Sequence, residues 1–205
     1  MKKYIALHLY LPLEGEESHL QLETIAAKLR RSRDTHVLVG GGWCYTGGYC
    51  RHEGPPTFSP VYLASKLREM GVGPERTHYF RQGRMPPCRW WTNVVSTWGE
   101  VKQMHMLLRV AGSFDEVFLQ FVGVKSHMER AVWLWKCYNA LMSLVGEGVD
   151  IAEYKIDGIE NRMGEEWSRG ERVRNLIAYL DPFGVGPAFV IHALRRWQAR
   201  GSYQS

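Results

Sequence analysis

Short apolar runs alternate along the chain with longer stretches in which apolar residues recur every three or four positions. Runs of consecutive or alternating apolar residues that stop at proline or glycine are typical of β-strands. Five segments have this pattern: 3–11, 36–39, 76–80, 116–124 and 149–156. The most apolar of them, 116–124, is expected to be a central strand. Asp157 and Gly158 follow the last run and favour a turn.

The stretches with helical periodicity lie between and after these runs. Three of them open with residues suited to a helix N-terminus, because Ser, Thr and Asn side chains accept hydrogen bonds from the N–H groups there and Pro fits the first helical position. These openings are Ser18, the pair Ser59 and Pro60, and Thr92 or Asn93. A long helix is expected to follow residue 125, and the tail offers two more, at about 165–180 and 187–199.

Strands that alternate with helices predict an α/β fold. The connection between the first two strands contains a helix, which makes a parallel pair the natural arrangement. We therefore expect one Rossmann-like, doubly wound domain over residues 1–205, with a mainly parallel five-stranded sheet and helices on both faces. In this architecture ligands bind beyond the carboxyl ends of the strands, near the point where the strand order reverses.

The segment 35–48 stands out, because a short apolar strand runs directly into Gly40, Gly41 and Gly42. Glycines at this place let a ligand approach the backbone closely. They also suit a tight strand exit against a closely packed helix, and the spacing is not that of the GxGxxG dinucleotide motif. Both interpretations stay open from the sequence.

Three segments that follow strands are expected to meet at one edge of the sheet. Helix starts present N–H groups, and lysine, arginine and histidine add positive donors, so together they suit an anionic ligand. The predicted ligand-binding residues are Gly40, Gly41, Gly42, Thr92, Asn93, Ser96, Lys125 and Arg130.

Among the titratable residues, His127 is the candidate catalytic acid or base, because an imidazole exchanges protons near neutral pH. The alternative is a helix-start histidine that bonds a nearby carbonyl group. Arg130 could instead form an ion pair with Glu129 or another surface acid. Glu100 is expected to be solvated, although it could reach a ligand amine if it faces the crevice, and His105 is expected to pack at the edge of the core.

The composition is that of an ordinary globular protein, with 205 residues of which 45% are hydrophobic and 23% charged. The net charge of +5 and a pI of about 9.1 favour anionic partners such as phosphates and nucleotides. The dense basic clusters, at 30–33 and 195–196, lie at apparent helix ends, where cations are favourable in any case.

Four cysteines are present, and no two form a CxxC pair. Cys44, Cys50 and His52 match no standard zinc spacing, so no metal is predicted. Reduced thiols in a cytoplasmic protein are the simpler interpretation. No apolar run approaches the roughly 20 residues needed to cross a bilayer, and no signal peptide is expected.

Several of these features together resemble the YdcF-like family. They are the glycine-terminated strand 37–42, the helix that ends in 67–76, the helix start at Thr92 and Asn93, and the sequence His-Met-Glu-Arg-Ala at 127–131 after an apolar strand. The resemblance covers about residues 3–180 and leaves 181–205 as a C-terminal helical extension. It implies a Rossmann-like domain whose crevice is formed by these segments, and binding of S-adenosylmethionine.

The chain departs from the family pattern at three places, one of which is the exit of the first strand, where residues 11–13 read Leu-Pro-Leu and a glycine-rich exit is usual. Residues 59–61 read Ser-Pro-Val where an acidic residue is usual, and Ser96 stands where an asparagine is usual. The departures put a family reaction in doubt more than they affect the fold.

Two hypotheses of function follow. The first is a cytoplasmic protein that binds S-adenosylmethionine or another nucleotide-type anionic ligand, with an enzymatic reaction left open. The alternative is a catalytically lapsed structural or interaction module in a larger assembly, which could contain nucleic acid.

Overall fold

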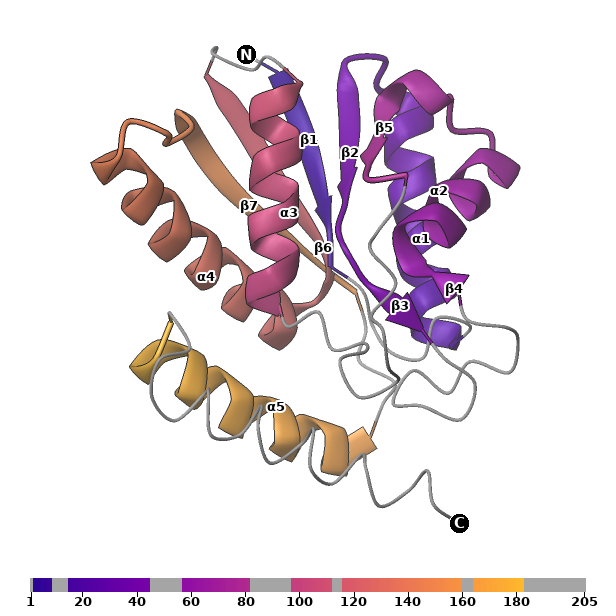
Figure 1. Ribbon diagram of the computed structural model, residues 1–205. Coiled ribbons are helices and arrows are strands. Elements are labelled where there is room, and N and C mark those ends of the chain that lie inside the picture. The colour runs from indigo at the N-terminus through magenta and orange to yellow at the C-terminus, as the bar shows by residue number, and fades with distance from the viewer. Residues whose placement is uncertain are drawn as a thin grey trace.

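The computed structural model describes residues 2–8, 15–44, 57–81, 97–111, 116–159 and 164–182. The elements in chain order are β1 (Lys2–Leu7), α1 (Glu16–Arg31), β2 (Thr35–Val39), β3 (Trp43–Cys44), β4 (Thr57–Phe58), α2 (Ser59–Glu69), the 3₁₀ helix η1 (Pro74–Arg76), β5 (Thr77–Tyr79), α3 (Thr97–Val110), β6 (Val117–Val124), α4 (Lys125–Leu144), β7 (Ile151–Ile159) and α5 (Gly164–Leu180). Figure 1 shows their arrangement.

The main sheet has five parallel strands in the order β5-β2-β1-β6-β7. The chain builds the sheet outward from β1 to β5 in one direction and then returns to add β6 and β7 on the other side of β1 (Figure 1). The strand order therefore reverses between β1 and β6. This is the Rossmann-like, doubly wound α/β fold that the sequence predicts.

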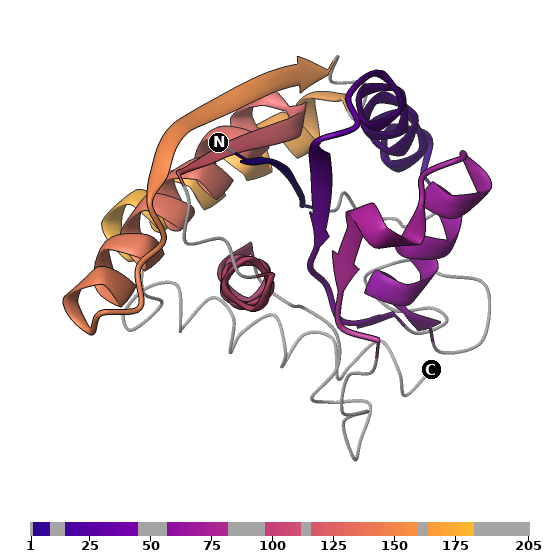
Figure 2. The same cartoon turned by 90° about the horizontal axis from the view of Figure 1, so that it is seen from above.

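Helices cover both faces of the sheet, because alternate residues of each strand point to opposite sides. In β1, Ile5 and Leu7 pack with residues of α1 and α2. Tyr4 and Ala6 pack on the other face, with residues of α3 and α4. Figure 2 shows the two pairs of helices on opposite sides of the sheet.

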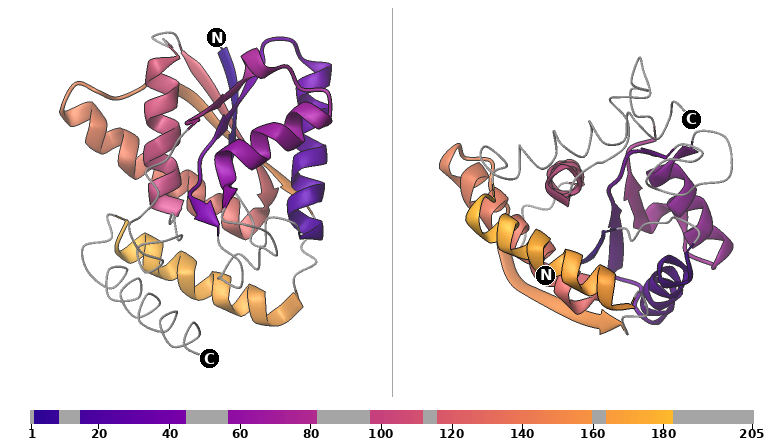
Figure 3. Two further views of the ribbon diagram at one scale, coloured as in Figure 1. Left: turned by 45° about the vertical axis from the view of Figure 1, so that its right-hand side comes forward. Right: turned by 90° about the horizontal axis from the view of Figure 1, so that it is seen from below.

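Helix α5 packs against the first half of α4. The indole Nε1 of Trp133 donates to the carbonyl oxygen of Ala178 at 3.1 Å. The amide Nδ2 of Asn175 donates to the carbonyl oxygen of Ser126 at 2.8 Å. Figures 1 and 3 show α5 lying along the carboxyl edge of the sheet, next to the start of α4.

Two sequence predictions about local structure are wrong. Asp157 and Gly158 do not form a turn but lie within β7, paired with Val122 and Gly123. Asp157 tolerates this position because its carboxylate accepts hydrogen bonds from Lys28 of α1 and, at 2.5 Å, from Nε2 of Gln120.

The second error concerns the start of α1. Ser18 does not cap this helix but lies buried inside it, and Gly15 is the N-cap residue. The acidic residues Glu16 and Glu17 occupy the first turn, where negative charge favours the positive end of the helix dipole. The predicted helix at 187–199 and the residues of 3–11 that follow His8 lie outside the described residues. In the described part of the chain, no helix combines the length and the apolar character that a membrane span requires.

Candidate functional site

The candidate site lies at the carboxyl edge of the sheet, where β1 and β6 end on either side of the reversal in strand order. Gln21 of α1, on one face of the sheet, forms hydrogen bonds with both chain segments near these strand ends. Its Nε2 donates to the carbonyl oxygen of His8 at 2.8 Å and to that of Val122 at 2.7 Å. Both protons of the amide group are thus used, and the side chain is fully buried.

A buried polar network lies on the opposite face of the same two strands. Nδ1 of His8, the residue after β1, lies 2.9 Å from Oε2 of Glu100 on α3. The indole Nε1 of Trp135 on α4 donates to Nε2 of His8 at 3.1 Å. The His8 ring also stacks on Phe121 of β6, with ring centroids 5.8 Å apart. Three elements that are distant in sequence therefore meet at the end of β1.

Glu100 is buried, with 7% of its surface exposed, so the expectation that it is solvated is wrong. The reason is the close approach of α3 to the end of β2. A Cβ atom added to Gly40 would lie 3.2 Å from the Cα, Cβ and carbonyl oxygen of Glu100. Because Gly40 has no side chain, α3 packs directly against the end of β2. This packing buries Glu100.

Hydrogen-bonding chemistry fixes the protonation of His8. The indole Nε1 of Trp135 can only donate, so Nε2 of His8 must accept and cannot carry a proton. The single ring proton is then on Nδ1 and is donated to Glu100. His8 is therefore a neutral imidazole that holds a carboxylate, and the imidazolium form would set two donors against each other.

Packing also explains Gly41, and a hydrogen bond holds Gly42. Gly41 has φ +149, and a Cβ atom there would lie 2.2 Å from Oγ of Ser59. The backbone N–H of Gly41 donates to Oε1 of Gln103 at 2.9 Å, and that of Gly42 donates to Oγ of Ser59 at 3.0 Å. Both N–H groups are thus engaged within the protein. Ligand contact at Gly40, Gly41 and Gly42 stays a prediction. A ligand would have to bind other atoms of this segment, or replace Gln103 and Ser59 as the acceptors of these two N–H groups.

His127 and Arg130 lie in the first turns of α4, directly after β6, and each has only 7% of its surface exposed. Nη2 of Arg130 lies 2.5 Å from Nδ1 of His127, and Nη1 donates to Oδ1 of Asn175 at 3.0 Å. Because a guanidinium group only donates, Nδ1 of His127 is the acceptor and its ring proton is on Nε2. The structure thus brings together the candidate base and a buried cation.

Lys125 contributes differently. Its side chain is 78% exposed, and Nζ lies 4.0 Å from Oε1 of Glu129. Exposed pairs at this distance contribute little to stability, which leaves the lysine able to turn toward an anion. Thr92, Asn93 and Ser96 lie outside the described residues.

The sequence reasoning missed His8, Gln21 and Trp135. His8 stands in an apolar run and Trp135 in an apolar helical stripe, where core packing is the default expectation. The only signal was that His8 occupies the end of the first strand, at the edge where doubly wound sheets bind ligands. His105 is buried, and its Nε2 donates a hydrogen bond to Oδ1 of Asn139 at 3.1 Å, which confirms its predicted place at the core edge.

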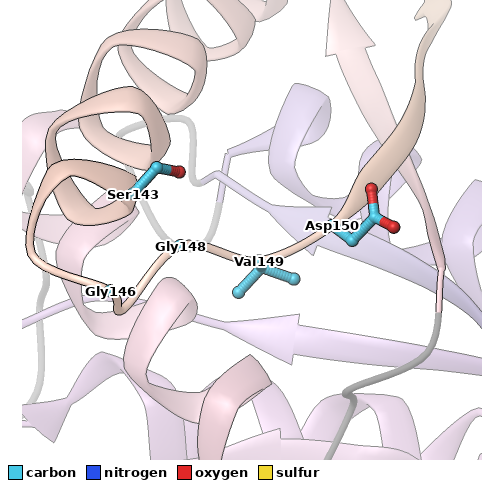
Figure 4. Close-up of a pocket in the computed structure, with 5 residues that line it drawn as sticks. All are labelled: Ser143, Gly146, Gly148, Val149 and Asp150. Atoms are coloured by element: carbon cyan, nitrogen blue, oxygen red, sulfur yellow. The ribbon is translucent and has the colours of Figure 1, made fainter.

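The opposite edge of the sheet offers no comparable chemistry in the described residues. An open hollow lies there between the end of α4 and the start of β7 (Figure 4), and its lining residues are Ser143, Gly146, Gly148, Val149 and Asp150. Asp150 is the one charged residue among them. Among the described residues, no three His, Cys, Asp or Glu side chains gather as they would around a metal ion.

A pair of histidines lies on neighbouring strands, away from the carboxyl edge of the sheet. Nδ1 of His36 on β2 is 3.0 Å from Nε2 of His78 on β5, and both rings lie near Tyr4 of β1. Burial lowers the pKa of His36, and the charges of Arg76 and Lys2 lower it further. Burial likewise lowers the pKa of His78, with His36 and Lys2 adding to the effect.

The histidine pair predicts a loss of stability in mild acid. A histidine with a lowered pKa binds fewer protons in the folded than in the unfolded state, so protonation favours unfolding. The contribution of each histidine is intact above its ordinary pKa of 6.5 and is lost as the pH falls from there toward the lowered value. Urea unfolding at pH 7.5 and pH 5.5 should show a lower free energy at pH 5.5. His78→Asn should reduce this difference, and an equal difference in the variant would contradict the assignment.

Comparison of the chain with protein-family models, with curated proteins and with solved structures found no match.

Proposed function

We propose that the protein binds a nucleotide-type small molecule through an anionic group, a carboxylate or phosphate, at the carboxyl edge of the sheet between β1 and β6, with S-adenosylmethionine as the first ligand to test. The observation that carries the proposal is the buried Arg130 at the start of α4, beside His127 and at the reversal of strand order. A buried guanidinium group beside a helix N-terminus produces a positive potential where this fold binds ligands.

The roles within the proposed site follow from charge and position. Arg130 would pair with a carboxylate or phosphate of the ligand, because its planar group bonds such anions in a fixed geometry. Lys125 would add a mobile positive charge at the rim. His127 is the candidate for proton transfer if a reaction occurs, since its Nδ1 accepts a hydrogen bond from Arg130 and its Nε2 carries the ring proton.

The test is thermal unfolding with millimolar S-adenosylmethionine, ATP or AMP. A ligand that binds only the folded state raises its stability by about 2.7 kcal/mol at one hundred times its dissociation constant. Arg130→Met should weaken binding about tenfold or more, because a charge-assisted hydrogen bond is lost. Lys125→Met should cost less, since its side chain is exposed.

Arg109→Met is the matched control. Arg109 lies on α3 and pairs with the exposed Glu147 at 2.6 Å, so its removal should leave affinity unchanged. Affinities are compared by titration at a temperature where every variant is folded, because Arg130 also bonds Asn175. No stabilisation by any of the three ligands would contradict the proposal and favour the alternative of a lapsed interaction module.

A further inference from the structure

The carboxylate of Glu100 is held at the proposed site with one oxygen uncommitted. Oε2 accepts the hydrogen bond from His8, whereas Oε1 makes no hydrogen bond with the described residues. The side chain keeps 9% of its surface exposed, so it is enclosed but not sealed. The exposed part of the side chain is where a ligand would approach this carboxylate.

The negative charge of Glu100 is not balanced by its protein partner. His8 is neutral, because the indole of Trp135 occupies Nε2 as a donor. Within the described part of the chain, Glu100 has no lysine or arginine within ion-pair distance, and His8 is its one charge-capable neighbour. Burial of a carboxylate is costly unless a cation or several donors compensate it. Among the described residues, the carboxylate of Glu100 therefore has no positive group that compensates its charge.

The structure holds this carboxylate in a fixed position. His8 is stacked on Phe121, bonded by Trp135, and anchored at its carbonyl oxygen by Gln21. Gly40 allows α3 to approach so closely that Glu100 lies against the end of β2. Charged groups that are fixed before binding lose little entropy when a ligand arrives, which is typical of recognition sites.

We infer that Glu100 binds a cationic group of the ligand, an ammonium or sulfonium group, and that His8 is the residue that positions it. The inference rests on the proposed function and specifies the ligand class: a molecule with a negative group toward Arg130 and a positive group toward Glu100. S-adenosylmethionine has both, since it carries a carboxylate, an ammonium and a sulfonium group. Anionic nucleotides such as ATP lack the positive group.

The first experiment compares the ligand-free protein with Glu100→Gln, which keeps the size of the side chain and removes its charge. The melting temperature of this variant should be equal to or higher than that of the wild type, because an uncompensated buried charge is removed. A structural ion pair would behave in the opposite way. A clearly lower melting temperature would overturn the inference, whatever the ligand.

The second experiment titrates wild type and Glu100→Gln with S-adenosylmethionine and with 5′-methylthioadenosine, which keeps the nucleoside and lacks the charged groups. The variant should bind S-adenosylmethionine about tenfold or more weakly and 5′-methylthioadenosine about as well as the wild type does. Glu147→Gln, which changes an exposed acid, should alter neither affinity. Equal changes for the two ligands, or no change, would overturn this inference and leave the proposed function standing. If neither ligand binds the wild type, this inference falls, and the proposed function falls with it only if ATP and AMP also fail to bind.

His8 is tested by the same pair of ligands. His8→Asn keeps a donor near the position of Nδ1 and should retain part of the affinity for S-adenosylmethionine, whereas His8→Leu should lose about as much as Glu100→Gln does. The affinity for 5′-methylthioadenosine should stay close to that of the wild type in both variants. A merely structural role would lower both affinities together, and that result would overturn the positioning role.

Discussion

Replacement of Gln21 by glutamate is expected to lower the free energy of unfolding by about 3 kcal/mol or more. The amide nitrogen of Gln21 donates to the carbonyl oxygens of both His8 and Val122 in a fully buried position. A carboxylate has no proton to donate, so it would face two carbonyl oxygens with a negative charge. Urea unfolding at pH 7.5, followed by circular dichroism, measures the change.

Two further variants isolate the cause. Gln21→Met keeps the approximate size of the side chain and removes the two hydrogen bonds together with Oε1, which has no hydrogen-bond partner among the described residues, so it should cost about 2 kcal/mol. Glu23→Gln makes the reverse change at an exposed position of the same helix and should stay within about 0.5 kcal/mol of the wild type. If Gln21→Glu were as stable as Gln21→Met, the two carbonyl oxygens would not be the partners that this position requires.

The fold is predictable because its main signals are local. Each strand is a short apolar run, each connection contains a helix, and right-handed crossovers then leave few arrangements open. The errors occur where a distant partner overrides local preference. Asp157 is a turn former by propensity, but Lys28 and Gln120 reach it from other elements and stabilise it within β7.

The site is less predictable because its key contacts are long-range. His8 and Glu100 are 92 positions apart, and no local period reveals that their side chains meet. The sequence predicts that Gly40, His127 and Arg130 lie at the carboxyl edge of the sheet, and the structure places them there. The sequence does not reveal that Gly40 serves the packing of α3, since that depends on how closely a helix far along the chain approaches.

Truncation of Trp135 should have the largest effect of any single change in this network. The side chain is fully buried between α4 and the sheet, edge-on to Phe121 with ring centroids 6.3 Å apart. Trp135→Ala removes this volume from the core and should cost about 3–5 kcal/mol. Thermal and urea unfolding give the change in stability.

Trp135→Phe separates the hydrogen bond from the packing. The ring is largely kept, but Nε2 of His8 loses its donor in a buried place, so about 1–3 kcal/mol should be lost. Trp133→Phe is the control, because it removes an indole donor from the same helix at a position that is only half-buried, where Nε1 donates to the carbonyl oxygen of Ala178. Water has better access beside a half-buried ring and can replace the donor there, so the cost should be smaller. Equal losses of stability at the two positions would mean that the hydrogen bond from Trp135 to His8 contributes no more than the hydrogen bond from Trp133 to Ala178. A larger loss at Trp135 would support the neutral state of His8, and with it the uncompensated charge of Glu100 on which the proposed ligand recognition depends.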